Sequence, residues 1–104
     1  MSIIFRVDGN TKIGLGHIFR CISIAKEIKK KCLIKGIIFL TKYKEGAFII
    51  KKSGFDVHVI NTEKINGYSK ELKTAKVLIT DFLNTENQYI LEIKEKFPNL
   101  KILS

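Results

Sequence analysis

The chain has 104 residues, of which 45% are hydrophobic, and it carries a formal net charge of +9. This length fits one small domain with a buried core. Uncharged apolar stretches such as GIIFL at residues 36–40 are far too short to span a membrane. The first residues, MSIIFRVDG, lack the basic region, long apolar core and cleavage site of a secretory signal. The composition therefore predicts a cytoplasmic protein and argues against a membrane-spanning one.

The basic residues are lysines except for Arg6 and Arg20, and they are spread along the whole chain. Only residues 26–31, KEIKKK, are dense, and they lie at the end of an expected helix, where cations complement the helix dipole. Modules that read RNA or DNA usually combine arginine with exposed aromatic residues, and no such stretch occurs. The pattern argues against a nucleic-acid partner, whereas the basic excess suits an anionic small molecule equally well.

Cys21 and Cys32 are too few for the disulfide framework of a small secreted domain. Neither belongs to a CxxC pair or a Cys/His cluster. Because free cysteines are commonly buried, we predict two core-facing thiols and no metal site.

The first half of the chain alternates between two kinds of pattern. Residues 2–7 form an apolar, β-rich run and predict a strand. Residues 17–30 place apolar side chains at three- and four-residue spacing, on one face of a helix. The run CLIKGIIFLT at 32–41 predicts a second strand, and residues 45–54 predict a short helix closed by Gly54.

The second half repeats this alternation. Residues 68–75 hold at most one short helix. A helix over 85–97 begins with a capping-box sequence at Thr85 and stops before Pro98, because the residue before a proline avoids the helical region. Strands are predicted over residues 56–60, 76–80 and 100–103.

Strands that alternate with helices over short connections predict an α/β fold, a Rossmann-like parallel sheet with helices on both faces. Right-handed crossovers give the strand order 3-2-1-4-5. Ligands of such sheets bind at the carboxyl ends of the strands, beside the point where the order reverses. Residues 8–17 and 80–85 meet at that point. We expect a single domain over 1–104 and, because the chain ends on a strand, a fragment of the N-terminal domain of a longer two-domain enzyme.

One of these loops is rich in glycine, with Gly9, Gly14 and Gly16. A P-loop needs Lys and then Ser or Thr after its second glycine, and this chain has Leu15 and Gly16 there. A dinucleotide fingerprint needs a third glycine where Phe19 stands. The loop therefore argues against ATP hydrolysis and NAD binding, and no cofactor is predicted.

The same glycines suit an anionic ligand. Gly14 and Gly16 let the backbone approach a ligand closely and adopt positive φ. The helix that starts at Gly16 or His17 turns its free amides and positive dipole end to the crevice, which suits a diphosphate. Arg20, one turn further on, adds a charge-assisted contact. His17 should point into the crevice, where it could serve as a base, a cap or a ligand contact.

Two carboxylates and a second histidine complete the candidates. Asp8 and Asp81 end the first and fourth strands, where they could hold substrate hydroxyls, orient His17 or cap the following turn. His58 alternates within DVHVI and has no partner in the sequence, so we do not predict a functional role for it.

The stretch RVDGNTKIGLGHIFRCISIAKEI, residues 6–28, resembles the N-terminal signature of the UDP-sugar hydrolases of pseudaminic acid biosynthesis. These enzymes hydrolyse UDP-2,4-diacetamido-2,4,6-trideoxy-β-L-altropyranose. Downstream, VLITDF at 77–82 is similar to a family strand that ends in aspartate, and KILS at 101–104 to the strand before a paired-aspartate segment. The signature positions that match are Arg6, Asp8, Ile13, Gly14, Gly16, His17 and Arg20.

The resemblance implies a GT-B architecture, in which two Rossmann-like domains flank a cleft, and this chain would be the first part of the N-terminal domain. The C-terminal, uridine-binding domain would be missing, so the chain alone would be inactive. His17 would be the general base that activates water for attack at the sugar C1. The amides of residues 14–17, Leu15 included, would serve the leaving diphosphate. No metal and no cofactor are implied.

One position departs from the family. Phe82 and Leu83 follow Asp81 where the family usually has His-Tyr, which leaves the exact sugar open. Two alternatives also stay open: a related nucleotide-sugar glycosyltransferase or epimerase, and a non-catalytic module that binds anions or nucleic acid.

Overall fold

The computed structural model describes residues 2–12, 14–32, 36–60, 72–73, 75–81 and 87–103, with the backbone alone for residues 2, 32, 81 and 87–90. Several predictions lie outside these residues. They concern Ile13, most of the helix expected over 68–75, and the loop after the fourth strand with Phe82, Leu83 and the Thr85 cap.

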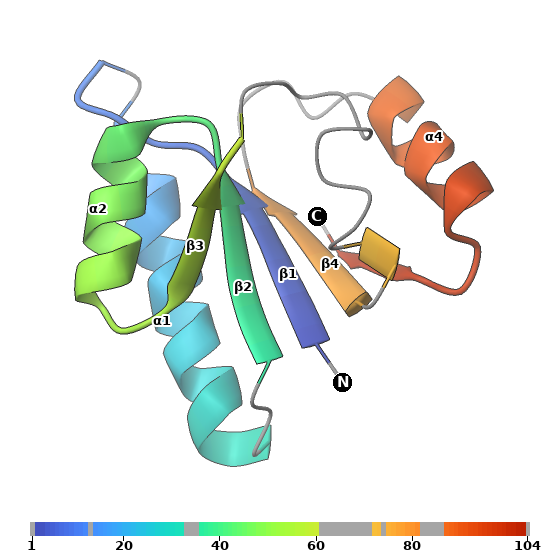
Figure 1. Ribbon diagram of the computed structural model, residues 1–104, viewed down its shortest axis with the longest axis horizontal. Helices are drawn as coiled ribbons and strands as arrows, with labels where there is room; N and C mark the ends of the chain where they lie inside the picture. Colours follow the sequence, from blue (N-terminus) through green and yellow to red (C-terminus); the bar gives the residue numbers. More distant parts are fainter. Residues whose placement is uncertain are drawn as a thin grey trace.

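Strands and helices follow one another along the chain as the periodicity predicts (Figure 1). The elements are β1 Ser2–Val7, α1 Gly16–Cys32, β2 Gly36–Thr41, α2 Lys44–Lys52, β3 Asp56–Val59, β4 Ala75–Asp81, α4 Asn87–Lys96 and β5 Lys101–Leu103.

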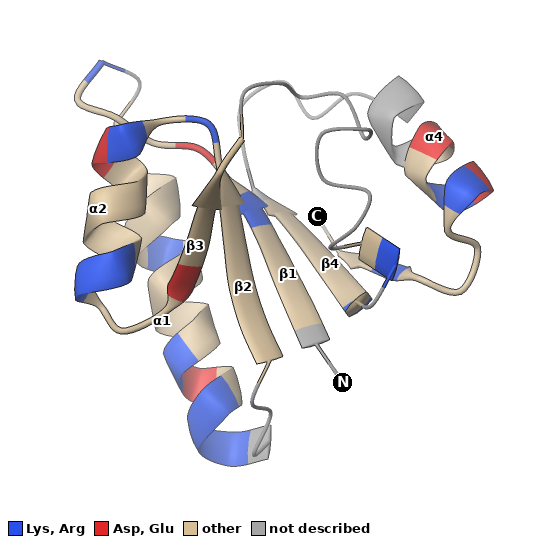
Figure 2. Cartoon of the chain, viewed as in Figure 1, with Lys and Arg blue, Asp and Glu red and all other residues tan. Residues whose placement is uncertain are grey.

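Within the described residues, the strands form a five-stranded sheet in the order β3-β2-β1-β4-β5. Every pair of neighbouring strands is parallel. The predicted α/β class and strand order are therefore confirmed. Charged residues lie mainly on the helices, whereas the strands are mostly uncharged (Figure 2). This pattern is typical of a parallel sheet that is covered on both faces.

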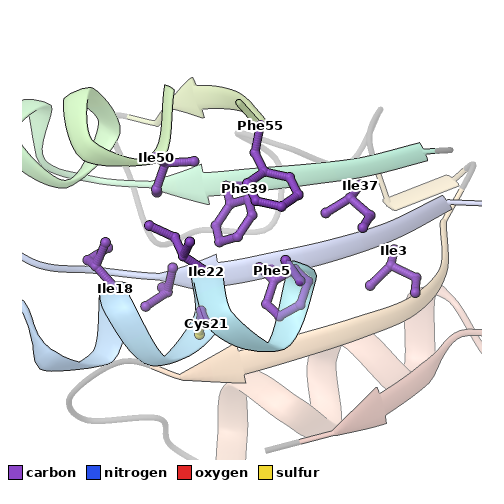
Figure 3. Close-up of a cluster of buried hydrophobic side chains, with 11 residues drawn as sticks. Ile3, Phe5, Ile18, Cys21, Ile22, Ile37, Phe39, Ile50 and Phe55 are labelled. Atoms are coloured by element: carbon purple, nitrogen blue, oxygen red, sulfur yellow. The ribbon is translucent and has the colours of Figure 1, made fainter. Parts of the chain in front are cut away.

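Alternate residues of β1 point to opposite faces of the sheet and divide the core in two. Ile3, Phe5 and Val7 face α1 and α2, while Ile4 and Arg6 face the other way. On the first face the ring of Phe5 stacks on that of Phe39, with centroids 4.8 Å apart (Figure 3).

The predicted face of α1 is confirmed, because its apolar residues are buried in this first cluster. They are Ile18, Cys21, Ile22 and Ala25, with Ile28 partly buried beside them. The second cluster, on the other face, joins Ile4, Leu40, Leu78, Ile93 and Leu100 and holds α4 against the sheet.

Some predicted boundaries are wrong. Cys32 ends α1 instead of starting the second strand, and β2 begins only at Gly36. Lysines favour helix, complement the dipole in the last turn and add an ion pair of 3.4 Å between Lys31 and Glu27, so the helix continues. Ala75, expected at the end of a helix over 68–75, is instead the first residue of β4. The end of α2 is confirmed, with φ of 94° at Gly54.

The glycine loop packs directly against α2. A Cβ atom built on Gly46 would lie 2.9 Å from the carbonyl oxygen of Gly9 and 3.0 Å from Cδ1 of Ile18. One built on Gly9 would lie 2.4 Å from Cγ1 of Ile18. Gly9 and Gly46, which lack side chains, therefore allow α2 to pack closely against the start of the loop and the first turn of α1.

We expect Gly46→Ala to lower the free energy of unfolding by a net of about 1–2 kcal/mol, because the added methyl group overpacks this junction at a cost of about 2–3 kcal/mol. The roughly 1 kcal/mol that alanine gains in helix propensity offsets only part of this overpacking cost. Urea denaturation measures the difference. Gly16→Ala is the control, because its methyl group would meet nothing within 4 Å. Unchanged or increased stability of Gly46→Ala would contradict the packing described.

Candidate functional site

The glycine loop leaves the carboxyl end of the central strand. The sheet order reverses between β1 and β4, and Val7 at the end of β1 pairs with Asp81 at the end of β4. This is the position at which doubly wound sheets bind their ligands. The backbone of Asp81 thus stands beside the loop as predicted, while the role of its side chain stays a prediction.

The loop is closed by its own backbone. The Gly14 amide donates to the carbonyl oxygen of Asn10 at 2.8 Å, and the Lys12 amide donates to Oδ1 of Asn10 at 2.9 Å. The Thr11 amide donates to Oε2 of Glu45 in the first turn of α2, also at 2.9 Å. These bonds give Asn10 the turn-forming role that sequence chemistry allows it, and they fix the loop next to α2.

The two central glycines differ. Gly14 is exposed and has φ of 96°, so the left-handed conformation predicted for it is confirmed. For Gly16 that prediction is wrong, because this residue is already the first of α1 and has no positive φ. A Cβ atom built on Gly16 would meet no protein atom within 4 Å, so the space beside this residue is open. Leu15 between them packs against the α1 and α2 core and anchors the end of the loop.

The start of α1 turns its backbone donors toward the loop. The Phe19 amide donates to the carbonyl oxygen of Leu15 at 3.1 Å. The earlier amides of a helix have no acceptor within it, and they carry the positive end of its dipole. The first turn of α1 contains no acidic residue to compensate this charge. An anion is therefore the chemical species that suits this position.

His17 and Arg20 meet beside these amides. Nη2 of Arg20 lies 2.9 Å from Nδ1 of His17, three residues earlier on the same helix. The imidazole is half-buried and the guanidinium exposed, while Ile18 between them points into the core. Both side chains therefore belong to the solvent side of the helix start.

Asp8 forms a buried ion pair that sequence reasoning missed. Nη1 and Nη2 of Arg6 lie 2.6 and 3.1 Å from the two carboxylate oxygens, and Arg6 is fully buried. The Lys42 amide donates to Oδ1 of Asp8 at 2.9 Å. Asp8 thus ties the ends of β1 and β2 together. Of its three predicted roles, the described contacts fit the structural one. Residues two apart on a strand share a face, and this spacing could have pointed to the pair.

The other parts of the chain that the structure describes add little to this site. No group of three potential metal ligands occurs among the residues that the structure describes, and none of their helices is long and apolar enough to cross a membrane. A cavity of about 440 Å³ lies near the amino ends of two strands, where Ala75 begins β4 and Leu100 precedes β5. The glycine loop lies at the carboxyl end of β1. The cavity is therefore separate from this loop. Basic residues lie on α1, α2 and α4, on both sides of the sheet (Figure 2).

Comparison with known proteins gives one informative similarity. The chain is 35% identical over 98 residues to the uncharacterized protein MJ1062 of Methanocaldococcus jannaschii, and the match covers 91% of this chain and 20% of that protein. The chain thus spans about a fifth of the length of this relative. No protein-family model matches the sequence, and no solved structure matches it significantly. The name of the relative assigns no activity.

Proposed function

We propose that the chain is the N-terminal Rossmann-like part of a cytoplasmic nucleotide-sugar hydrolase with a GT-B architecture. The enzyme would release UDP from a UDP-sugar by attack of water at the sugar C1, in the biosynthesis of nonulosonic acids for surface glycans. The observation that carries this proposal is the position of the glycine loop. Its exposed Gly14 and the first turn of α1 lie over the carboxyl end of the central strand, beside the reversal of strand order.

The site supplies groups for each part of that reaction. The amides at the start of α1 and the Arg20 guanidinium would stabilise the negative charge that develops on the leaving diphosphate. His17, on the same turn, would take a proton from the attacking water. In this proposal Asp8 does not contact the substrate. Its bonds to Arg6 and to the Lys42 amide hold the ends of β1 and β2 in place beneath the glycine loop.

The remaining half of the cleft would come from a further domain that holds the uridine. The relative, of which this chain covers about a fifth, is compatible with such an arrangement. We therefore expect the 104 residues alone to hydrolyse no UDP-sugar. Turnover by this chain alone would show that a second domain is not needed.

The deciding experiment offers the whole protein a UDP-sugar with and without an acceptor. UDP-2,4-diacetamido-2,4,6-trideoxy-β-L-altropyranose is the first substrate to test. A hydrolase releases UDP without an acceptor and places oxygen from isotope-labelled water on C1 of the sugar. Strict dependence on an acceptor would instead indicate a glycosyltransferase, and isomerisation with the UDP retained would indicate an epimerase.

Gly16→Ala tests the loop itself. A methyl group at this position meets no protein atom within 4 Å, so the variant should fold as the wild type does. It would occupy the space through which a phosphate approaches the helix start, and we expect kcat/KM to fall at least about tenfold. Ser23→Ala, an exposed position on the same helix, is the matched control. Equal kcat/KM for all three proteins would argue against diphosphate binding at this loop.

A further inference from the structure

The contact between His17 and Arg20 is compatible with only one tautomer of the imidazole. A guanidinium has five N–H donors and no acceptor. The 2.9 Å contact between Nη2 and Nδ1 therefore requires Nδ1 to accept. The ring is then neutral, with its proton on Nε2.

This arrangement is the reverse of the usual one for a catalytic histidine. There a carboxylate accepts from Nδ1–H and leaves Nε2 as the base. Asp8 is the described carboxylate at the end of β1, but its oxygens bind the Arg6 guanidinium and the Lys42 amide. With Arg20 in place, His17 has its lone pair engaged at Nδ1 and a proton at Nε2. In this state neither nitrogen can accept a proton from water.

We propose that Arg20 is a positioning residue that holds His17 in this inactive state until a diphosphate draws the guanidinium away. Arginine forms charge-assisted, bidentate hydrogen bonds with phosphate, and these are stronger than a bond to a neutral imidazole nitrogen. The identity of the ligand rests on the function proposed above, whereas the tautomer rests on the contact alone.

Release of the imidazole from Arg20 allows the hydrolysis step to proceed. Once Arg20 binds the diphosphate, Nδ1 accepts a proton from water and the ring becomes an imidazolium. The oxygen of that water forms the new bond to C1. The bond between C1 and the diphosphate oxygen breaks, and its electron pair leaves with UDP. His17 thus becomes a base only when the leaving group is bound, and the base nitrogen is Nδ1.

Nitrogen NMR of the imidazole in the 104-residue chain tests the tautomer without any turnover. We expect the proton on Nε2 and an Nδ1 signal typical of a hydrogen-bond acceptor. Addition of inorganic diphosphate should move the Nδ1 signal to the position that Arg20→Ala shows without it. A proton on Nδ1, or the same Nδ1 signal in wild type and Arg20→Ala, would overturn the proposal.

Calorimetric titration with inorganic diphosphate tests the competition. If Arg20 must leave His17, then His17→Ala removes a competing bond and should bind diphosphate about 3- to 10-fold more tightly. The gain should disappear when Arg20→Ala is added. Weaker binding by His17→Ala would mean that the imidazole only contacts the ligand. Absence of binding by every variant would refute the anion site, and with it the competition, while the NMR result still decides the tautomer.

Discussion

Replacement of Asp8 by alanine is expected to lower the free energy of unfolding by about 3–5 kcal/mol, because it leaves the charge of Arg6 buried without its carboxylate. Arg6 is fully buried and has two nitrogens within 3.1 Å of Asp8 oxygens. The variant also removes the acceptor of the Lys42 amide. A loss of this size is a large share of the 5–15 kcal/mol that typically stabilises a domain, on the order of a third. Urea denaturation followed by circular dichroism measures it.

The matched control is Asp56→Ala, which removes an exposed aspartate from the edge strand β3. Its effect should stay within about 0.5 kcal/mol. A double variant with Arg6→Met and Asp8→Asn should recover part of the loss, because the buried charge is removed together with its partner. Wild-type stability of Asp8→Ala would show that the ion pair does not support the fold.

Replacement of His17 by alanine is expected to reduce kcat of the whole protein by about 10²–10⁴-fold, the usual contribution of a general base. The half-exposed ring is not part of either core cluster, so the midpoint of thermal unfolding should not change. Turnover of a UDP-sugar, measured as UDP release, gives the first quantity and calorimetry the second.

His58→Ala serves as the control for this experiment, because it removes the other histidine, which is exposed on β3. Its kcat should remain within about threefold of the wild-type value, a change below 1 kcal/mol. If His17→Ala retained a similar kcat, the proton would have to be taken by another group, and the resemblance on which the base role depends would lose its main support.

The order of elements could be predicted because it depends on local periodicity. Ile18, Cys21, Ile22 and Ala25 repeat at helical spacing, and each of them is buried in the fold. The boundary at Cys32 could not be predicted in this way. A short apolar run that follows a helix has the same composition as the start of a buried strand, and only the neighbouring elements separate the two.

The candidate site was predictable in position but less so in its contacts. The left-handed Gly14 follows from the need for a tight turn before a helix. The role of Asp8 depends on Lys42, which is far away in the sequence and comes near only when β1 and β2 pair. The sequence predicts only a ligand contact for Arg20, although its three-residue spacing from His17 also allows the two side chains to meet.

The packing of Ile18 has a mechanical consequence for the site. Its fully buried side chain fills the space left by Gly9 and Gly46. The side chain is tightly packed between these two glycines. The first turn of α1 therefore cannot slide along its axis or rotate unless the Ile18 side chain leaves this position. The packing of Ile18 therefore holds the backbone of this turn, and with it the amides, in a fixed position, whereas the long, exposed side chain of Arg20 can adjust to a ligand.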